Sequence, residues 1–341
     1  MDSIDVLIVA AMVSGALFLA PTAAGAREPA TPHQVIRDFE ATFDVHPGEP
    51  TNHARAMCAR GEFVGTSAAS MLTRSRLFAG HPVPVVAQFS VSRGNASSRS
   101  AHEMALEFRL SDGSRQHMAM LSTPVFAASE PLVFNEMIKA VKPDPNTGEP
   151  DQGRLRDFLD SHPDAFAQSN FLAATEPPAS YANSAYFSIH TFRFIDADGR
   201  THFVRWRFIP DDGEQRTPAS QRVSTHGSSM EERLSERLRR GPVRWDMMVY
   251  VGESNDTTDN ASIAWPEGRQ HLKAGTLTIT QATPGIAADC ESARFDPLIV
   301  ADGIALSDDP VLLLRSPSYA IAFVGRLSQA LGSPRAVVVD R

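Results

Sequence analysis

Arg315 and Tyr319 stand four residues apart near the end of the chain, a spacing that could support metal chemistry. On a helix this spacing places both side chains on one face, one turn apart. A tyrosine in water has a pKa near 10, so a phenolate at pH 7 costs about 4 kcal/mol, which a metal cation and a neighbouring guanidinium could offset. The spacing alone favours a simpler interpretation, a buried aromatic ring with an arginine on the next turn.

His53 is a second candidate, because an imidazole titrates near neutral pH and can move a proton between two atoms. By itself it does not differ from a partly buried structural histidine. The sequence has no GxGxxG or GxxxxGK nucleotide loop, no GxSxG nucleophile elbow, no HExxH and no CxxC. The commonest motif-based functions are therefore excluded.

Composition limits the classes of partner. The 341 residues are 42% hydrophobic and carry a formal net charge of -8, with lysine at positions 139, 142 and 273 alone. No dense basic stripe exists to collect phosphates, so we expect no nucleic-acid partner. Cys58 and Cys290 are too few and too far apart for a disulfide framework or a four-ligand zinc site. We expect two small buried thiols, with a single long-range disulfide as the alternative.

The N-terminus resembles an export signal. Val6 to Leu19 is an apolar run of about 14 residues, shorter than the roughly 20 needed to span a bilayer, and Ala24-Gly25-Ala26 follows. We predict a signal peptide over 1–26, a periplasmic or secreted product without stable membrane insertion, and one domain over 27–341. The leading MDSID is acidic, so an uncleaved anchor or a misplaced start codon remains an alternative.

Short alternating segments dominate the rest of the chain and predict an α+β fold. Its centre would be an antiparallel barrel of about eight strands with helical insertions. Turn residues at Asp112-Gly113 and Asp198-Gly199 separate pairs of these segments. We expect strands that include Glu62, Val83, His102, Gln116 and Leu277 and segments 185–196 and 201–211, and helices over 30–50, 131–141, 153–162 and 230–240.

Several short blocks resemble, in the same order, those of the haem catalases. The match runs from about Pro32 to about Arg326, and its length and C-terminal block look like the smaller catalase-related peroxidases. The blocks are His53-Ala54-Arg55 with Gly61-Glu62-Phe63, PVVAQFS at 84–90, Asp112-Gly113 with STPVF at 122–126, 185–194, Asp296-Pro297-Leu298, Asp308-Asp309-Pro310 and RSPSY at 315–319.

This resemblance implies a haem b group buried between the barrel and C-terminal helices. Tyr319 would be the iron ligand, with Arg315 as the partner of its phenolate. His53 would be the distal base, and Ser90 would orient its ring. Phe134 would pack against the haem and Phe126 would line the same pocket, with barrel-core packing as the alternative for both.

Three positions depart from the family pattern. Leu121-Ser122 stands where catalases have the distal asparagine, a loss that favours peroxidase activity over dismutation of hydrogen peroxide. The arginines that bind the haem propionates map to Pro50 and Gln88, neither of which is charged. Other propionate partners are therefore expected: Arg326, which lies seven residues after Tyr319 and is the best candidate, and also Arg55 and Arg60.

The function implied by the resemblance is that of a haem-dependent peroxidase. It would reduce hydrogen peroxide or organic hydroperoxides with small organic electron donors, through a ferryl intermediate, and protect against oxidative stress. The alternatives are a weak true catalase, a non-enzymatic haem-binding barrel and an isomerase of fatty-acid hydroperoxides similar to allene oxide synthase. Family catalases are tetramers built through an N-terminal arm and additional C-terminal regions. This shorter chain has little of either, so we expect a monomer or homodimer.

Overall fold

The computed structural model describes residues 30–43, 53–92, 100–147, 149–217, 229–285, 288–293 and 295–330. For 53–55, 92, 288, 291, 319 and 322–330, the backbone alone is described. The predicted signal peptide over 1–26, Pro50 and the expected helix end at His46-Pro47-Gly48 lie outside the described residues.

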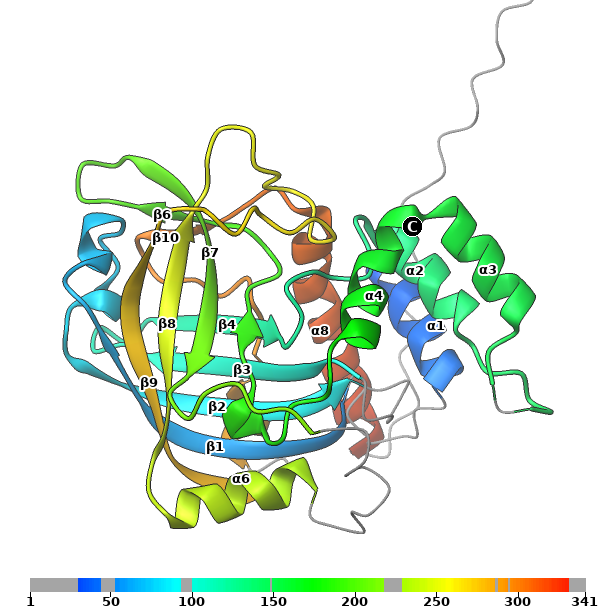
Figure 1. The fold of residues 1–341 in the computed structure, drawn as a ribbon, viewed down its shortest axis with the longest axis horizontal. Helices are drawn as coiled ribbons and strands as arrows, with labels where there is room; N and C mark the ends of the chain where they lie inside the picture. Colours follow the sequence, from blue (N-terminus) through cyan, green and yellow to red (C-terminus); the bar gives the residue numbers. More distant parts are fainter. Residues whose placement is uncertain are drawn as a thin grey trace, which may run out of the picture.

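Eight antiparallel strands close into a barrel, which confirms the expected fold class (Figure 1). Around the barrel the order is β7-β5-β4-β3-β2-β1-β9-β8, and pairing between β7 and β8 closes it. β6 pairs with β7, and β10 pairs with β6. The strands are β1 (His53–Gly65), β2 (Pro82–Ser92), β3 (His102–Arg109), β4 (Arg115–Leu121), β5 (Tyr186–Phe187), β6 (Phe192–Ile195), β7 (Thr201–Pro210), β8 (Val243–Val251), β9 (His271–Pro284) and β10 (Ile304–Leu306).

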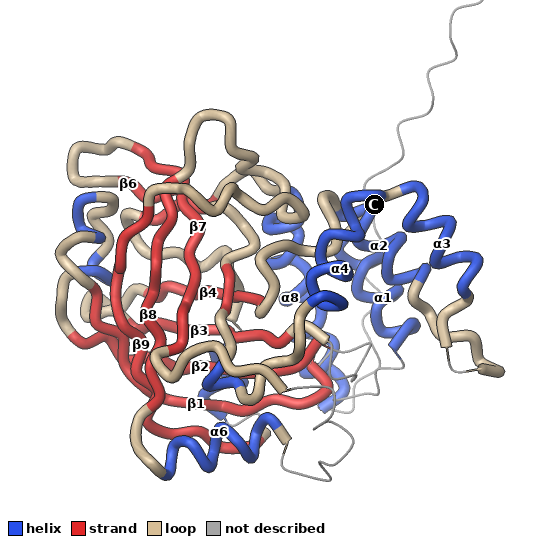
Figure 2. The backbone as a smooth tube through the Cα atoms, in the orientation of Figure 1, coloured by secondary structure: helices blue, strands red, loops and turns tan. Residues whose placement is uncertain are grey.

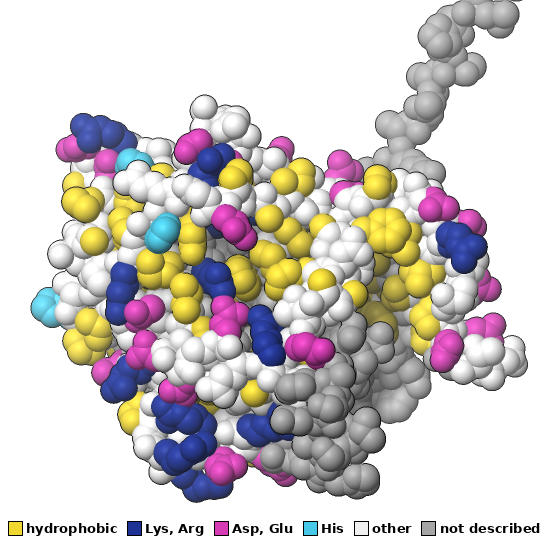
Figure 3. Space-filling view, viewed as in Figure 1, with side chains coloured by type: hydrophobic (Ala, Val, Ile, Leu, Met, Phe, Trp, Pro, Cys, Tyr) yellow, Lys and Arg dark blue, Asp and Glu magenta, His cyan; other side chains and the backbone are white. Residues whose placement is uncertain are grey.

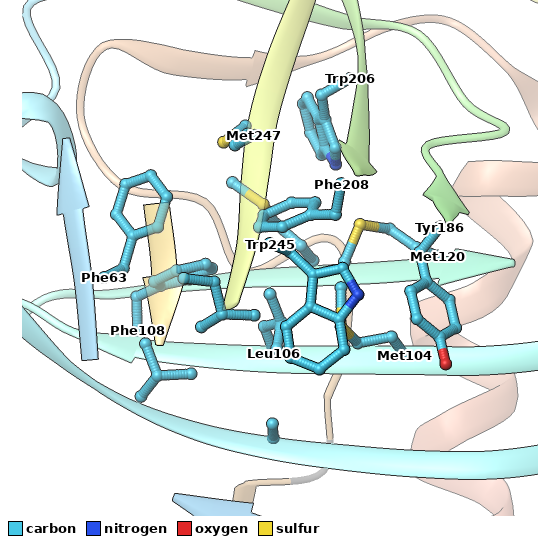
Figure 4. Packing of buried hydrophobic residues seen from close by; sticks show 14 of the residues in the cluster. Phe63, Met104, Leu106, Phe108, Met120, Tyr186, Trp206, Phe208, Trp245 and Met247 are labelled. Atoms are coloured by element: carbon cyan, nitrogen blue, oxygen red, sulfur yellow. The ribbon is translucent and has the colours of Figure 1, made fainter. Parts of the chain in front are cut away.

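The barrel interior is a packed apolar core (Figure 4). Side chains alternate between the two faces of each strand, and the inward set is mostly apolar. Phe63 meets Phe108 edge-on with ring centroids 5.4 Å apart, and Trp245 stacks on Phe89 at 5.7 Å. An eight-stranded barrel is just wide enough for side chains to fill it. Its interior therefore holds the fold together.

Most helices gather on one side of the barrel (Figure 2). There α1, α2 and α8 share an apolar cluster that includes Val35, Ile138 and Leu314. Within the described ranges, no helix combines the length and apolar character needed to cross a bilayer. The helices are α1 (Pro32–Phe43), α2 (Pro131–Ala140), α3 (Gln152–Ser161), α4 (Phe166–Ala174), α6 (Met230–Arg239), α7 (Ala288–Ala293) and α8 (Pro310–Ala330), and the short 3-10 turns are η1 (Ala69–Met71), η2 (Arg76–Phe78), η3 (Pro163–Ala165) and η4 (Tyr181–Asn183).

The expected elements differ from the structure in a few places. The strand expected around Glu62 begins at His53, and the strand expected over 185–196 divides into β5 and β6. Strand β8 and helix α4 were not expected. The division arises because the segment between β5 and β6 turns its polar side chains to partners elsewhere in the chain, including a hydrogen bond from His190 to Asp309.

A disulfide joins Cys58 to Cys290, which corrects the expectation of two free buried thiols. Cys58 lies on the outer face of β1, and Cys290 lies on α7. Barrel closure pairs β1 with β9, and the chain that leaves β9 returns α7 over β1 and β2, where the Cys290 Sγ lies 3.3 Å from the Ala87 carbonyl oxygen. The two cysteines are 232 residues apart, so their meeting depends on this closure.

Charges of both signs are interspersed over the barrel on the face shown in Figure 3. Glu214, for example, lies between Arg207 and Arg216 and pairs with both. On the strands themselves, Lys273 Nζ lies 2.7 Å from an Asp246 oxygen. On this face, basic and acidic side chains therefore alternate, and the basic ones do not gather into one patch.

Candidate functional site

Three rows of residues cross β1 to β4 on the outer face of the barrel. Along these strands every second residue belongs to the core, and the residues between them face outward. Cross-strand pairing then aligns the outward residues. The first row is Ala56, Ser90, Glu103 and Leu121; the second row is Cys58, Gln88, Ala105 and Ala119; the third row is Arg60, Val86, Glu107 and His117.

The predicted distal residues lie at the first row. Ser90 is 1% exposed and Gln88, in the second row, is 6% exposed, although both lie on the outer face of the barrel. This face is therefore covered by other parts of the chain. The backbone of His53 pairs with Ser92, one step beyond the first row, and the ladder shifts register between His53 and Arg55. Such bulges are common beside active sites, where they redirect a side chain. The roles of His53 and Ser90 stay predictions.

The position of the missing asparagine is also on this face. Leu121 ends the first row and is half-buried. The Ser122 hydroxyl accepts a hydrogen bond from the His102 backbone N–H at 2.9 Å, and the Ser122 N–H donates to the His102 carbonyl at 2.8 Å. Ser122 therefore extends the pairing of β3 with β4, and neither residue supplies an amide to the first row.

Phe126 and Phe134 pack together outside the barrel core, with ring centroids 5.3 Å apart. The Gln168 amide donates to the Thr123 hydroxyl and to the Val125 carbonyl, each at 3.1 Å, and so fixes the segment before Phe126. Phe134 also belongs to the cluster that contains Leu314 of α8. The two rings thus lie among the helices, and the alternative of barrel-core packing is wrong. Their contact with a haem stays a prediction.

Helix α8 begins at a buried polar network. The Asp309 carboxylate accepts hydrogen bonds from the backbone N–H groups of Val311 and Leu312, at 2.9 and 3.2 Å, and so caps the helix. Its other oxygen lies 2.7 Å from Nδ1 of His190. Since a carboxylate only accepts, Nδ1 carries the proton, and Nε2 is left to accept from Arg315 Nη1 at 3.4 Å. Asp309, His190 and Arg315 therefore form one chain of hydrogen bonds.

Burial keeps His190, at the centre of this network, uncharged. Desolvation lowers the pKa of His190 below its ordinary value, and this effect outweighs the raising effect of Asp309. His190 is therefore uncharged near pH 7 and can accept from Arg315. Burial also lowers the pKa of Arg205 to about 10, so Arg205 stays charged. Arg205 donates to the Thr191 hydroxyl at 3.0 Å and to the Ile263 carbonyl at 2.7 Å, which fixes the loop between β8 and β9 beside the network.

The expected helical spacing of Arg315 and Tyr319 is present in α8. Both residues lie on one continuous helix, one turn apart, and Arg326 follows Tyr319 by two further turns. The side chains of Tyr319 and Arg326 lie outside the described part of the structure. Ligation by Tyr319 and propionate binding by Arg326 therefore stay predictions.

Of the other propionate candidates, Arg60 pairs with Asp289 and its side chain is 64% exposed. Gln88 is buried in the second row and is uncharged. The side chain of Arg55 is not described. Arg60 is thus engaged elsewhere, and Arg326 remains the best candidate.

Sequence reasoning named the blocks around His190 and Asp309 but gave neither residue a role. A signal for Asp309 was present, because an aspartate directly before a proline and an apolar run is typical of a helix start. No comparable signal exists for His190, which meets Asp309 across 119 residues.

Comparisons with known proteins show the family of the chain. A model of the catalase family, described as "Catalase", matches residues 36–332. The chain is 42% identical over 300 residues to a "Catalase-related peroxidase" of Synechococcus elongatus, covering 87% of this chain and 88% of that protein. It is 34% identical over 295 residues to a "Catalase-related peroxidase" of Mycolicibacterium paratuberculosis, covering 85% of this chain and 93% of that protein.

Solved structures of catalases share the fold. A fungal catalase aligns with a TM-score of 0.72 and 22% identity over 83% of this chain, and catalase A of Saccharomyces cerevisiae aligns with a TM-score of 0.72 and 21% identity over 83%. The alignments cover 60% and 62% of those longer chains. The chain therefore belongs to the catalase family.

Proposed function

We propose that the protein is a haem peroxidase that reduces hydrogen peroxide or organic hydroperoxides with small organic electron donors. The observation that carries this proposal is the hydrogen-bonded chain of Asp309, His190 and Arg315 at the base of α8. It holds a guanidinium in place one helical turn before the tyrosine that would bind iron. The "Catalase-related peroxidase" relatives support the same activity.

The residues fit the haem cofactor of the catalase family. An arginine carries five N–H donors, so the bond from Arg315 to His190 is compatible with a further bond to a phenolate one turn along the helix. Tyr319 would hold the iron, Arg326 would pair with a propionate, and we propose haem b as the type of haem. When bound, the haem supplies the electrons that break the O–O bond of the peroxide, and small organic donors restore them.

Proton transfer to and from the peroxide would be the task of residues in the first row and next to it. His53 would take a proton from one oxygen of the peroxide and return it to the other. Ser90, which is buried in the first row, would orient the His53 ring. Leu121 offers no hydrogen bond to a second hydrogen peroxide molecule, which favours reduction by organic donors over dismutation.

Export and assembly are proposals of the same kind. The disulfide between Cys58 and Cys290 supports an oxidising compartment, because disulfides persist outside the cytosol. Together with the apolar run that precedes Ala24-Gly25-Ala26, it supports a periplasmic or secreted protein that is cleaved after residue 26. We propose one domain over 27–341, a monomer or homodimer, and a role in protection against peroxide stress.

The experiment that tests this function is an absorption spectrum of the protein purified with haem supplied. Stoichiometric peroxide is added while dissolved oxygen is recorded, and a phenolic donor follows. The proposal expects a ferric Soret band that changes with peroxide, releases no oxygen and recovers with the donor. Vigorous oxygen release would instead identify a true catalase, and the absence of any Soret band would remove the haem assignment.

A further inference from the structure

Helix α8 contains a proline at position 317, between Arg315 and Tyr319. Proline has no N–H group to donate to the carbonyl four residues earlier, and its ring crowds that carbonyl. Proline also disfavours the helical conformation of the residue before it, which is Ser316 here. The turn that carries the predicted phenolate partner and iron ligand is therefore weakened within the helix itself.

Ser316 makes a hydrogen bond outside the helix at this point. Its hydroxyl donates to the carboxylate of Asp296, which belongs to the segment between α7 and β10. Ser316 and Asp296 are both half-buried, whereas Pro317 is exposed. Hydrogen bonds to a carboxylate are roughly twice as strong as those between neutral groups. The bond therefore ties the weakened turn of α8 to another part of the protein.

Asp296 is itself held in place by backbone hydrogen bonds. Its other carboxylate oxygen accepts from the Leu298 N–H at 2.9 Å, and its carbonyl accepts from the Ile299 N–H at 3.0 Å. The Ile299 carbonyl in turn accepts from the N–H of His117 on β4 at 2.8 Å. The segment that carries Asp296 is therefore fixed to the barrel.

The residue before Asp296 fixes the same segment to the disulfide. Phe295 is buried in a cluster that includes Cys58 and Cys290. It has a φ of +48°, in the left-handed region, which is unfavourable for a residue with a bulky side chain. Such a conformation persists where the surrounding structure holds it. The disulfide and the Phe295 ring therefore hold this segment against the outer face of the barrel.

We propose that Asp296 is a positioning residue for Arg315, acting through Ser316. This inference rests on the proposed function and deepens it. His190 holds the end of the Arg315 side chain, and the bond from Ser316 to Asp296 holds the backbone one residue further along α8. Held at both ends, Arg315 keeps one geometry relative to the next turn of the helix, which carries Tyr319.

The test compares Ser316→Ala with a matched control, Ser318→Ala. Both variants replace serine with alanine on α8, so the change in helix propensity is common to both. The Ser318 hydroxyl donates to the Leu314 carbonyl at 2.9 Å, a bond within the helix. With haem supplied, hydrogen exchange of the backbone N–H groups over 315–320 should be about 10-fold faster in Ser316→Ala and parental in Ser318→Ala.

A second readout reports on the iron ligand. Hydrogen bonds to a metal ligand tune the electronic properties of the metal. The absorption bands and the reduction potential of the ferric haem should therefore shift in Ser316→Ala and remain parental in Ser318→Ala. Ser316→Thr restores a hydroxyl group and should restore the parental values. A bond that only stabilises the helix would leave the spectrum and the potential unchanged.

A variant of the acceptor tests the other side of the bond. Asp296→Asn keeps a side-chain oxygen that can accept from Ser316 but removes the charge, so its spectral shift should be smaller than that of Ser316→Ala. Combined with Ser316→Ala it should add little, because both substitutions act on one hydrogen bond. Fully additive shifts would show that Asp296 does not act through Ser316.

Failure of this inference is distinguishable from failure of the proposed function. If the parent takes up haem and reacts with peroxide, but Ser316→Ala keeps the parental exchange rates or the parental spectrum, Asp296 does not position Arg315 and the peroxidase assignment stands. If the parent takes up no haem, both proposals are wrong. Should Ser316→Ala fold poorly, Asp296→Asn replaces it: a shifted spectrum supports the inference and a parental spectrum overturns it.

Discussion

The inner and outer faces of β1 to β4 are made by alternate residues of the same strands, yet they differ in character. Inward residues such as Phe89 and Met104 fill the barrel with apolar side chains. Outward residues such as Ser90 and Glu103 place polar groups beneath the covering segments. The barrel interior maintains the fold, and the chemistry that we propose belongs to the outer face.

We expect the largest effect from a substitution on the outer face, and it should be an effect on the rate of reaction with peroxide. His53→Ala should leave haem bound and slow the reaction with peroxide about 1,000-fold, because proton transfer by the distal base is lost. Rapid-mixing absorption spectroscopy of the haem-loaded protein measures the rate. His81→Ala is the matched control, since His81 is an exposed histidine just before β2. A parental rate in His53→Ala would show that this face is not the reaction site.

A substitution on the inner face should act on stability instead. Trp245 is fully buried, stacks on Phe89 and donates from Nε1 to the Ser184 carbonyl at 3.1 Å. Trp245→Ala should lower the free energy of unfolding by about 4 kcal/mol, measured by chemical denaturation. Trp245→Phe keeps most of the ring contact and should cost about 1 kcal/mol through the lost hydrogen bond. Equal losses in the two variants would contradict this account of the core.

The disulfide joins helix α7 to the outer face of β1 and should have an intermediate effect. Reduction of Cys58–Cys290 should lower the free energy of unfolding by about 3 kcal/mol, because the unfolded chain regains freedom across a long loop. Denaturation with and without a reductant measures the change. The double variant Cys58→Ala with Cys290→Ala should not respond to the reductant. If the parent does not respond either, the two cysteines are unpaired in solution.

The smallest expected effect is a dependence of the unfolding free energy on pH, caused by His102 at one end of the core. Burial lowers the pKa of His102 to about 4 in the folded protein, whereas the unfolded chain binds that proton near pH 6.5. The unfolded state therefore binds more protons between these values, and stability falls as pH falls. From pH 7 to pH 5 this histidine should remove about 2 kcal/mol of unfolding free energy.

Denaturation curves at several pH values test this dependence on His102. The control is His102→Phe, which keeps a ring edge-on against Tyr181 and removes the titrating group. Its unfolding free energy should change less between pH 7 and pH 5 than that of the parent. The same slope in both proteins would assign the pH dependence to other groups.

Much of the fold follows from local sequence patterns. The strand expected over 201–211 is β7, in which the alternate residues Val204, Trp206 and Phe208 are buried. The turn at Asp112-Gly113 joins β3 to β4 as expected, and Gly113 has a φ of +84°, which glycine adopts without strain. Strand β8 shows the same alternation from Val243 to Val249 and could have been predicted by the same rule.

The site was less predictable, because it depends on contacts between distant segments. The resemblance indicated His53, Ser90, Arg315 and Tyr319. The structure places the backbone of Ser90 in the first row, that of His53 one step beyond it, and those of Arg315 and Tyr319 on α8. His190 and Asp309 meet only after the barrel has formed.

Barrel closure also constrains the order in which the chain can fold. Just beyond the end of the ladder between β1 and β9, the Thr66 hydroxyl donates to the Lys273 carbonyl, and these two residues are 207 positions apart in the chain. Contacts of such long range form slowly, since a large loop must close first. The barrel cannot close until β9 has been synthesised, and α8 follows β9 in the chain. Haem binding at the site that we propose beside α8 would therefore come late in maturation, after both β9 and α8 have been synthesised.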